Sequence, residues 1–240
     1  MSSTKTFGDI VFDFQSHKIP IHLKLSKRIV DILYSVEWEY QPKTKEENGK
    51  SIIEIIGCGH YGCAFFSNNN KIIKVTDDHE EALSVLKYTV QAKNLYDVFI
   101  PVHKVYMSLE TTILWKDYAN FFPLSEEDGE FLSNILDQVT DEYEEWHLIK
   151  DTDAKMEKII DFARRIRKLY QEYQIICTDI KPENIGLYRK KLCIFDIGYV
   201  EFGRNWSSDE ELENYLKIMN SLEDKNEIID IGELRNEVWG

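Results

Sequence analysis

The sequence predicts an α+β fold. Short apolar runs separated by turn residues recur between residues 51 and 116, a spacing typical of strands in an antiparallel sheet. Apolar residues also recur at helical spacing over residues 154–174, which predicts one long amphipathic helix. Apolar residues make up 43% of the 240 residues and include five Trp, a composition that indicates a folded globule. A chain of this length can form one large domain or two small lobes.

The stretch from residue 51 to residue 118 carries the clearest strand pattern. We expect strands at 51–56, 64–67, 71–75, 102–107 and 111–116. Three asparagines, Asn68–Asn70, predict a turn between the second and third strands. A helix from about His79 to Leu95 interrupts the series. This order predicts a small antiparallel sheet with one helix laid against it.

The first 50 residues read as an extension without recognisable chemistry. Polar and apolar residues alternate in two short runs within residues 9–25, which predicts short strands. A helix is expected from Ser26 to about Glu39. Its apolar face consists of Ile29, Ile32, Leu33 and Val36. Residues 41–50 are polar and charged, and they predict a loop.

Residues 119–240 alternate between weak and strong patterns. The acidic and aromatic stretch 120–150 predicts irregular or partly helical structure, with no function assigned to it. The helix over 154–174 is followed by a buried strand and loop at 175–187 and a strand at 192–195. A last helix is expected near Ser208, because Ser208 and Glu211 have capping-box spacing. Its buried face would be formed by Leu212, Tyr215, Leu216 and Met219.

The overall charge and the cysteines exclude several classes of protein. The formal net charge of −14 opposes sequence-independent binding to nucleic acid or to anionic membrane. Such acidity usually serves solubility, and a surface that attracts a basic partner is the alternative. The chain has neither an apolar signal core at its start nor about 18 consecutive apolar residues. Cys58 and Cys63 lie in a glycine-rich stretch where a bridge would distort the loop, so we expect reduced thiols. A cytoplasmic protein is the expectation.

A glycine motif lies between the first two predicted strands. Gly57, Gly59 and Gly62 match Gly-x-Gly-x-x-Gly, in which the missing Cβ atoms let backbone N–H groups approach phosphate oxygens. The same string opens dinucleotide sites, but there it leads into a helix, whereas here a strand follows. An ordinary glycine-containing hairpin is the alternative.

A cation and a carboxylate follow this motif. Lys74 lies in an apolar strand, where an ammonium group needs a counter-charge. Glu80 and Glu81, at the start of the next helix, are the candidates for that counter-charge. We favour Glu81, because Val85 lies on the same helical face. Asp78 and Glu81 also have capping-box spacing, so closing the helix start is the alternative role.

The densest polar cluster comes later in the chain. The run Asp179-Ile180-Lys181-Pro182-Glu183-Asn184 is followed by Phe195-Asp196-Ile197-Gly198 at the end of an apolar strand. Phosphoryl transfer from ATP needs a carboxylate facing the acceptor hydroxyl, a cation on the γ-phosphate and oxygen ligands for Mg²⁺. These residues could supply that set.

In these motifs the chain resembles the protein kinase superfamily, and its Asp-x-Lys-Pro-Glu-Asn run resembles the serine/threonine branch. The resemblance covers residues 51–118 and 155–200. It implies a two-lobed fold, with a sheet and one helix in an N-lobe at 51–118 and a reduced helical C-lobe at 119–240. Residues 1–50 would be an N-terminal extension. ATP would lie between the lobes, with its adenine near residues 115–119.

The resemblance also implies a role for each matched residue. Asp179 would orient the acceptor hydroxyl, and Lys181 would neutralise charge on the transferring phosphate. Asn184 and Asp196 would hold Mg²⁺, or Mn²⁺ in its place. The cofactor-binding set for ATP would consist of Gly57, Gly59, Gly62, Lys74 and Glu81. The acceptor would be a Ser or Thr hydroxyl of a protein.

The chain departs from the family pattern in ways that matter for regulation and substrate. Cys177-Thr178 stands where the family usually has His-Arg, so control by a phosphorylated activation loop is not expected. Ile197 replaces the usual Phe. The 42 residues that follow Gly198 (240 minus 198) contain no Ala-Pro-Glu. The expectation is therefore a minimal kinase of the kind found in bacteria or their viruses, placed in the cytoplasm of the cell or host.

Two other functions remain open. A small-molecule phosphotransferase of the aminoglycoside or choline type shares the Asp-x₄-Asn spacing and the later Asp, and the reduced C-lobe favours it. Lys181 argues against it, since that branch usually lacks this lysine. A pseudokinase that binds and inhibits a partner through its acidic surface is the non-enzymatic alternative. Retention of Lys74, Asp179, Asn184 and Asp196 argues against that one.

Overall fold

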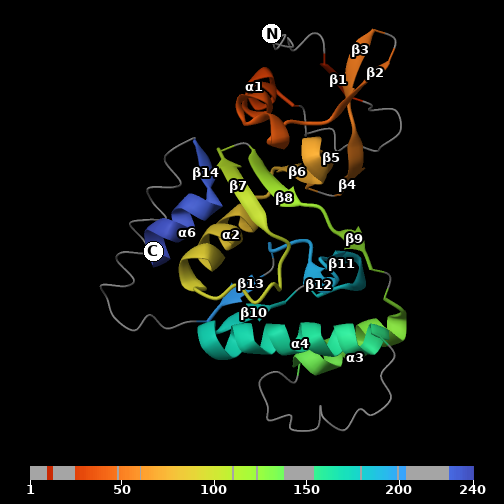
Figure 1. Cartoon of the computed structure of the whole chain (residues 1–240), viewed down its shortest axis with the longest axis vertical. Coiled ribbons are helices and arrows are strands. Elements are labelled where there is room, and N and C mark those ends of the chain that lie inside the picture. Colours follow the sequence, from red (N-terminus) through yellow and green to blue (C-terminus); the bar gives the residue numbers. More distant parts are fainter. Residues whose placement is uncertain are drawn as a thin grey trace. The chain divides into compact units, whose positions relative to one another are not determined.

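The computed structural model describes residues 10–12, 25–47, 49–59, 61–109, 111–122, 124–137, 154–178, 180–198, 200–203 and 227–240 (Figure 1). Helices and antiparallel sheets are combined, so the predicted α+β class is confirmed. The chain divides into two compact units. The first unit contains the described residues of Met1–Ala82, Val102–Tyr118 and Lys225–Ile231, and the second contains the others.

A six-stranded antiparallel sheet forms the centre of the first unit, in the order β14-β7-β8-β6-β5-β4. Its strands are β4 (Ile55–Cys58), β5 (Gly62–Phe66), β6 (Lys71–Thr76), β7 (Val102–Met107), β8 (Thr112–Asp117) and β14 (Ile228–Asp230). Strands β5, β6, β7 and β8 fall where the sequence predicted strands, whereas the single strand predicted at 51–56 is divided between β4 and β3 (Lys50–Ile53), which belongs to a smaller sheet. The sixth, β14, comes from near the C-terminus and pairs with β7, and the local sequence pattern did not predict it.

A smaller sheet contains the predicted loop at 41–50, and there the prediction was wrong. Residues Thr44–Glu47 form β2, which pairs with β3 (Lys50–Ile53), and β1 (Ile10–Phe12) adds in parallel to β3. The side chains of Thr44–Glu46 show no buried face, so β2 lacks the apolar alternation that marks a half-buried strand. The Asn48-Gly49 pair was the overlooked signal, since Asn-Gly favours tight hairpin turns. Gly49 adopts a φ of 73°.

Helix α1 (Lys27–Ser35) begins as predicted and ends four residues early. The Ser26 side chain accepts a hydrogen bond from the Ile29 N–H and caps the first turn. The Gln41 side-chain amide donates to the carbonyls of Tyr34 and Val36, which satisfies acceptors left open at the helix end. A 3₁₀ turn at Trp38–Tyr40 follows. The side chain of Gln41 therefore replaces a further turn of helix.

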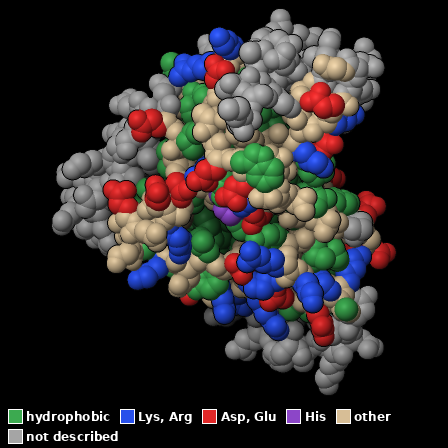
Figure 2. Space-filling model, turned by 45° about the horizontal axis from the view of Figure 1, so that its top comes forward, with side chains coloured by type: hydrophobic (Ala, Val, Ile, Leu, Met, Phe, Trp, Pro, Cys, Tyr) green, Lys and Arg blue, Asp and Glu red, His purple; other side chains and the backbone are tan. Residues whose placement is uncertain are grey.

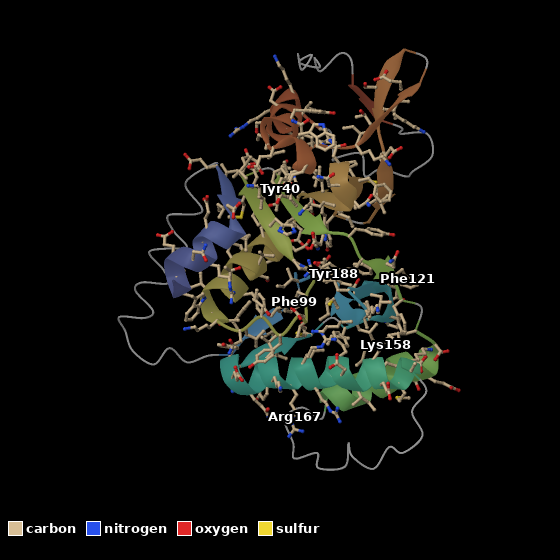
Figure 3. All side chains as sticks on the ribbon, viewed as in Figure 1. Tyr40, Phe99, Phe121, Lys158, Arg167 and Tyr188 are labelled. Carbon is tan, nitrogen blue, oxygen red and sulfur yellow. A yellow bond between two sulfur atoms is a disulfide. The ribbon has the colours of Figure 1, made fainter. Side chains whose placement is uncertain are left out.

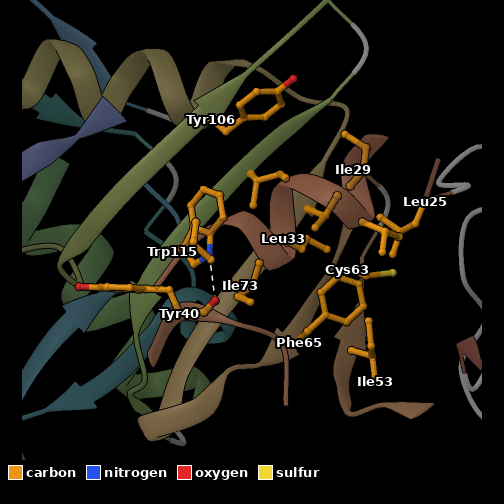
Figure 4. Packing of buried hydrophobic residues seen from close by; sticks show 14 residues of the cluster. Leu25, Ile29, Leu33, Tyr40, Ile53, Cys63, Phe65, Ile73, Tyr106 and Trp115 are labelled. Atoms are coloured by element: carbon orange, nitrogen blue, oxygen red, sulfur yellow. Dashed lines mark hydrogen bonds between the residues drawn. The ribbon is translucent and has the colours of Figure 1, made fainter. Parts of the chain in front are cut away.

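Helix α1 and the large sheet share one hydrophobic core (Figure 4). Ile29 and Leu33 of α1 belong to the same buried cluster as Ile73 of β6 and Trp115 of β8. The Trp115 indole N–H donates to the Tyr40 carbonyl at 3.1 Å, which ties the chain after α1 to the sheet. Because strand side chains alternate, the residues that flank Ile73 and Trp115 face the opposite side of the sheet.

The second unit is built on helices. They are α2 (Glu80–Gln91, whose first residues belong to the first unit), α3 (Glu126–Asp137), α4 (Ala154–Tyr173) and α6 (Ile231–Trp239). Its strands are β9 (Asn120–Phe121), β10 (Ile175–Cys177), β11 (Ile185–Tyr188), β12 (Lys191–Ile194) and β13 (Val200–Phe202). They form the sheets β12-β11-β9 and β10-β13. Thus part of the 120–150 stretch is helix α3, and residues 138–150 lie outside the described residues.

The predicted amphipathic helix is confirmed in α4, which packs against α3, β10 and β12. Ile159, Ala163 and Ile166 are buried as expected. The helix also buries Arg165, which the apolar pattern did not reveal. Its guanidinium donates to the carbonyls of Asp97 and Leu192 and pairs with Asp161, so the charge is compensated where it is buried.

Near the C-terminus, the predicted helix starting at Ser208 lies outside the described residues. Helix α6 lies beyond it and was not predicted. Arg235 of α6 donates to the carbonyls of Ala92 and Lys93, just past the end of α2, and Trp239 donates to the Thr89 carbonyl. These bonds satisfy acceptors that a helix end leaves open, so α6 completes α2. None of the described helices is long and apolar enough to cross a membrane.

Removing the Leu33 side chain tests the packing of α1 on the sheet. Leu33 has 0% exposure in the core, so Leu33→Ala should lower the free energy of unfolding by about 2–5 kcal/mol. Urea denaturation followed by tryptophan fluorescence measures it. Asp31→Ala, at an exposed position of the same helix, should change the value by less than about 0.5 kcal/mol. Equal effects of the two changes would contradict the packing.

Candidate functional site

The glycine motif forms a hairpin between β4 and β5, as its strand–turn–strand pattern indicated. Gly59 N–H donates to the Gly62 carbonyl at 2.8 Å, and the next pair outward is Cys58 with Cys63. Such pairs without hydrogen bonds bring Cα atoms closest in an antiparallel ladder. Cys58 and Cys63 form a disulfide, with Cα atoms 4.0 Å apart. The expectation of reduced thiols was therefore wrong, because the two cysteines pair across adjacent strands and the bridge joins them there.

The three glycines of the motif have different surroundings. A Cβ on Gly62 would lie 2.2 Å from the Val75 carbonyl oxygen, so Gly62 is required for β5 to pack against β6. A Cβ on Gly57 or Gly59 would meet no described atom within 4 Å, apart from neighbours in the chain. The first two glycines therefore have free space where a Cβ would lie. The third serves the packing of the sheet.

The tip of the hairpin is tied to the end of β6. The Tyr61 carbonyl accepts hydrogen bonds from the Thr76 hydroxyl and from the Asp77 N–H, both at 3.1 Å. His60 lies outside the described residues. Two hydrogen bonds and a disulfide therefore hold the short loop that carries Gly59.

Lys74 on β6 pairs with Glu81, and not with Glu80, in the first turn of α2. Its Nζ lies 2.5 Å from Glu81 Oε2. The Glu80 N–H donates to the Asp78 side chain, which caps the helix. The Glu81 side chain pairs with Lys74, which is not the capping-box role that was the alternative. The Lys74–Glu81 pair that the sequence favoured is thus present.

A second lysine, which the sequence reasoning missed, shares the same carboxylate. Lys116 Nζ on β8 donates to Glu81 Oε1 at 2.5 Å. The exposed fractions of the side chains are 2% for Glu81, 8% for Lys116 and 25% for Lys74. Lys116 follows the apolar run Ile113-Leu114-Trp115. A charged residue directly after such a run is the sequence feature that could have indicated a buried lysine in need of a counter-charge.

The hairpin of β11 and β12 brings two predicted metal ligands to one place. Ile185 pairs with Ile194, and beyond that pair the Phe195 N–H donates to the Asn184 carbonyl at 2.7 Å. Asn184 and Asp196, 12 residues apart in sequence, therefore lie at the same end of this hairpin. The Asp196 carboxylate accepts a hydrogen bond from the Gly198 N–H at 3.0 Å.

The loop before this hairpin holds the other predicted residues. Residues Pro182–Asn184 form a 3₁₀ turn, in which the Asn184 N–H donates to the Lys181 carbonyl at 2.9 Å. Lys181 is thereby placed one turn before Asn184. Asp179, the predicted catalytic carboxylate, lies outside the described residues. The surrounding protein raises the pKa of Cys177 to about 12 by burial, so this thiol is neutral near pH 7.

Close packing supports the position of Asp196. A Cβ on Gly186 would lie 2.3 Å from the Phe195 ring, so only glycine lets this ring pack on β11. Phe121 of β9 pairs with Gly186, while Tyr188 lies at the far end of β11 (Figure 3). Arg165 anchors β12 through the Leu192 carbonyl. The hairpin that ends at Asn184 and Asp196 is thus held from several sides.

The oxygen donors at this hairpin end suit a hard cation. Mg²⁺ takes carboxylate and amide oxygens and keeps several waters, so it needs few protein ligands. Asn184 and Asp196 provide one side-chain oxygen donor group each. Within the described ranges, no cluster of three or more His, Cys, Asp or Glu side chains could hold a metal ion.

The charge distribution is mixed on the visible surface. Figure 2 shows Lys and Arg side chains lying among Asp and Glu side chains on the face that it displays.

No protein-family model matches the chain, and no curated protein matches it significantly. The resemblance to protein kinases therefore stays a prediction from the sequence motifs.

Alanine substitutions separate the packing glycine from the open ones. Gly62→Ala should lower the free energy of unfolding by about 1–3 kcal/mol, because its Cβ would overlap the backbone of β6. Gly57→Ala and Gly59→Ala should each cost less than about 1 kcal/mol. Thermal and urea unfolding measure all three. A Gly59→Ala protein that is less stable than Gly62→Ala would contradict the assignment.

Thiol counting tests the disulfide. Of the four cysteines, denatured protein should alkylate two before reduction and four after it. Replacing both Cys58 and Cys63 by Ser should lower the free energy of unfolding by about 2 kcal/mol, since the short cross-link no longer restricts the unfolded chain. Mass spectrometry and urea titration give the two values. Alkylation of all four thiols without a reductant would rule the bridge out.

Proposed function

We propose that this protein transfers the γ-phosphoryl group of Mg·ATP to a Ser or Thr hydroxyl of another protein. The Lys74–Glu81 ion pair supports the proposal most, because kinases need a strand lysine paired to a helix carboxylate before it can bind phosphate. It occurs in the expected order, after a glycine hairpin and at the start of a helix. A two-lobed kinase-like arrangement, with ATP bound between the lobes, is part of the proposal.

Each residue would act on a different part of the reaction. Lys74 would bind the α- and β-phosphates, and the space beside Gly57 and Gly59, where no side chain intervenes, would admit the phosphate oxygens. Asn184 and Asp196 would hold Mg²⁺, which neutralises charge on the phosphates. Asp179 would orient the acceptor hydroxyl and take its proton, and Lys181 would stabilise the charge on the transferring group.

The partners follow from the same chemistry and from the charge. ATP is the phosphoryl donor, with Mg²⁺ or Mn²⁺ as its metal. A net charge of −14 favours a basic protein substrate and disfavours nucleic acid and anionic membranes. We propose the cytoplasm as the location. The Cys58–Cys63 disulfide argues against this location, because such bridges are rare in the reducing cytoplasm.

Substitution of the catalytic carboxylate and the phosphate-binding lysine tests the function. With Mg²⁺ or Mn²⁺, the wild type should transfer phosphate from labelled ATP to protein. Asp179→Asn and Lys74→Met should each lower the rate of this transfer at least about a hundredfold. Lys71→Met is the matched control. Lys71 lies on the same strand but faces Tyr40, so its loss should leave the rate unchanged.

The choice of acceptor separates the alternatives. Cell lysate with ATP, followed by phosphoproteomics against Asp179→Asn, should reveal phosphorylated Ser or Thr. Phosphate found only on amino-alcohols would establish the small-molecule phosphotransferase. An inactive wild type across proteins and amino-alcohols would favour the pseudokinase, and activity that survives both substitutions would refute the catalytic assignment.

A further inference from the structure

The carboxylate of Glu81 meets two ammonium groups, and the two contacts differ. Oε1 accepts a hydrogen bond from Lys116, whereas Oε2 lies 2.5 Å from Lys74 without accepting a hydrogen bond from any described residue. The contact to Lys116 is a hydrogen-bonded ion pair, the stronger type of contact. The contact to Lys74 relies on charge alone.

The sheet register explains why both lysines reach the same carboxylate. Lys74 pairs with Leu114, and Lys116 pairs with Ile72. The two lysines are thus diagonal neighbours on adjacent strands, and their side chains lie on one face. Their neighbours Ile73 and Trp115 belong to the core with α1 on the other face. Glu81 is therefore held from two strands at once.

The two lysines also differ in their access to water. Lys116 has 8% exposure and Lys74 has 25%. A buried ammonium and a buried carboxylate stabilise each other, and separating them leaves a charge in a poorly hydrated place. Lys74 is the lysine that solvent reaches, so it is also the one that an incoming ligand can reach.

We propose that Lys116 is a positioning residue for phosphate binding, which holds the Glu81 carboxylate in place while Lys74 shares its own charge with the nucleotide phosphates. This inference rests on the proposed function. It extends that function to a residue outside the motifs that suggested it. With Lys116 present, the buried Glu81 keeps one full partner when phosphate draws on Lys74. Without it, phosphate and carboxylate would compete for a single ammonium group.

Nucleotide binding provides a readout that does not depend on activity. Calorimetry compares a non-hydrolysable ATP analogue with Mg²⁺ against adenosine, which lacks phosphates. K116M should weaken binding of the analogue about tenfold, which is the usual effect of removing a residue that orients a ligand-binding side chain without touching the ligand. Adenosine affinity should stay unchanged. In turnover, K116M should raise KM for ATP more than it lowers kcat.

A double-mutant cycle tests whether Lys116 acts through Glu81. In a Glu81→Gln background, K116M should cause no further loss of analogue affinity, because the group it holds has already lost its charge. An equal loss in both backgrounds would mean that Lys116 acts elsewhere, and it would overturn the inference. Should K116M fail to fold, K116Q keeps a donor without the charge and enters the same comparison.

The control is Lys104→Met. Lys104 makes an ion pair with Asp230 at 2.9 Å on the same sheet, but it lies over the Tyr40 ring on the face towards α1. Its loss should leave analogue affinity unchanged. If K74M abolishes analogue binding while K116M binds like the wild type, the inference fails and the proposed function stands. If K74M itself binds like the wild type, both fail.

Discussion

A buried carboxylate that must be compensated organises the first unit. Glu81 has 2% side-chain exposure and lies between ammonium groups from two neighbouring strands. Leaving such a charge without its partners costs several kcal/mol, so the start of α2 is held where Lys74 and Lys116 place it. Core packing of α1 against the other face fixes the two strands in turn. The orientation of Lys74 therefore depends on both faces of one sheet.

Close packing against two glycines fixes other parts of the candidate site. At Gly62 and Gly186 a Cβ would overlap neighbouring atoms, so these glycines permit contacts that set strand and ring positions. At Gly57 and Gly59 the space is open. Within the motif Gly57-x-Gly59-x-x-Gly62, the third glycine is thus needed for packing, whereas the first two are not. The hairpin that packs on Gly186 carries Asn184 and Asp196 to one end, whatever ligand they bind.

Local patterns predicted the elements whose apolar residues recur at the period of their structure, such as α4, β6 and β8. They failed for β2, whose polar residues show no apolar alternation, so that Asn48-Gly49 was the overlooked signal of the turn. Lys116 and Arg165 were missed for another reason. Each depends on a partner in another strand or segment, and one-dimensional spacing does not identify such partners. The Cys58–Cys63 bridge was considered and rejected, because the sequence does not show that these two residues pair across the hairpin. Glu81 was found because a lysine in an apolar strand demands a carboxylate.

The proposed phosphoryl transfer requires one nucleotide to contact both Lys74 and the Asn184–Asp196 pair. A crystal structure with Mn²⁺ and a non-hydrolysable ATP analogue tests this directly, because anomalous scattering locates the metal. The proposed function predicts a manganese ion bound by Asn184, by Asp196 and by phosphate oxygens, with the Lys74 ammonium group in contact with the same phosphates. Manganese bound away from these two residues, or a nucleotide that touches neither them nor Lys74, would contradict it.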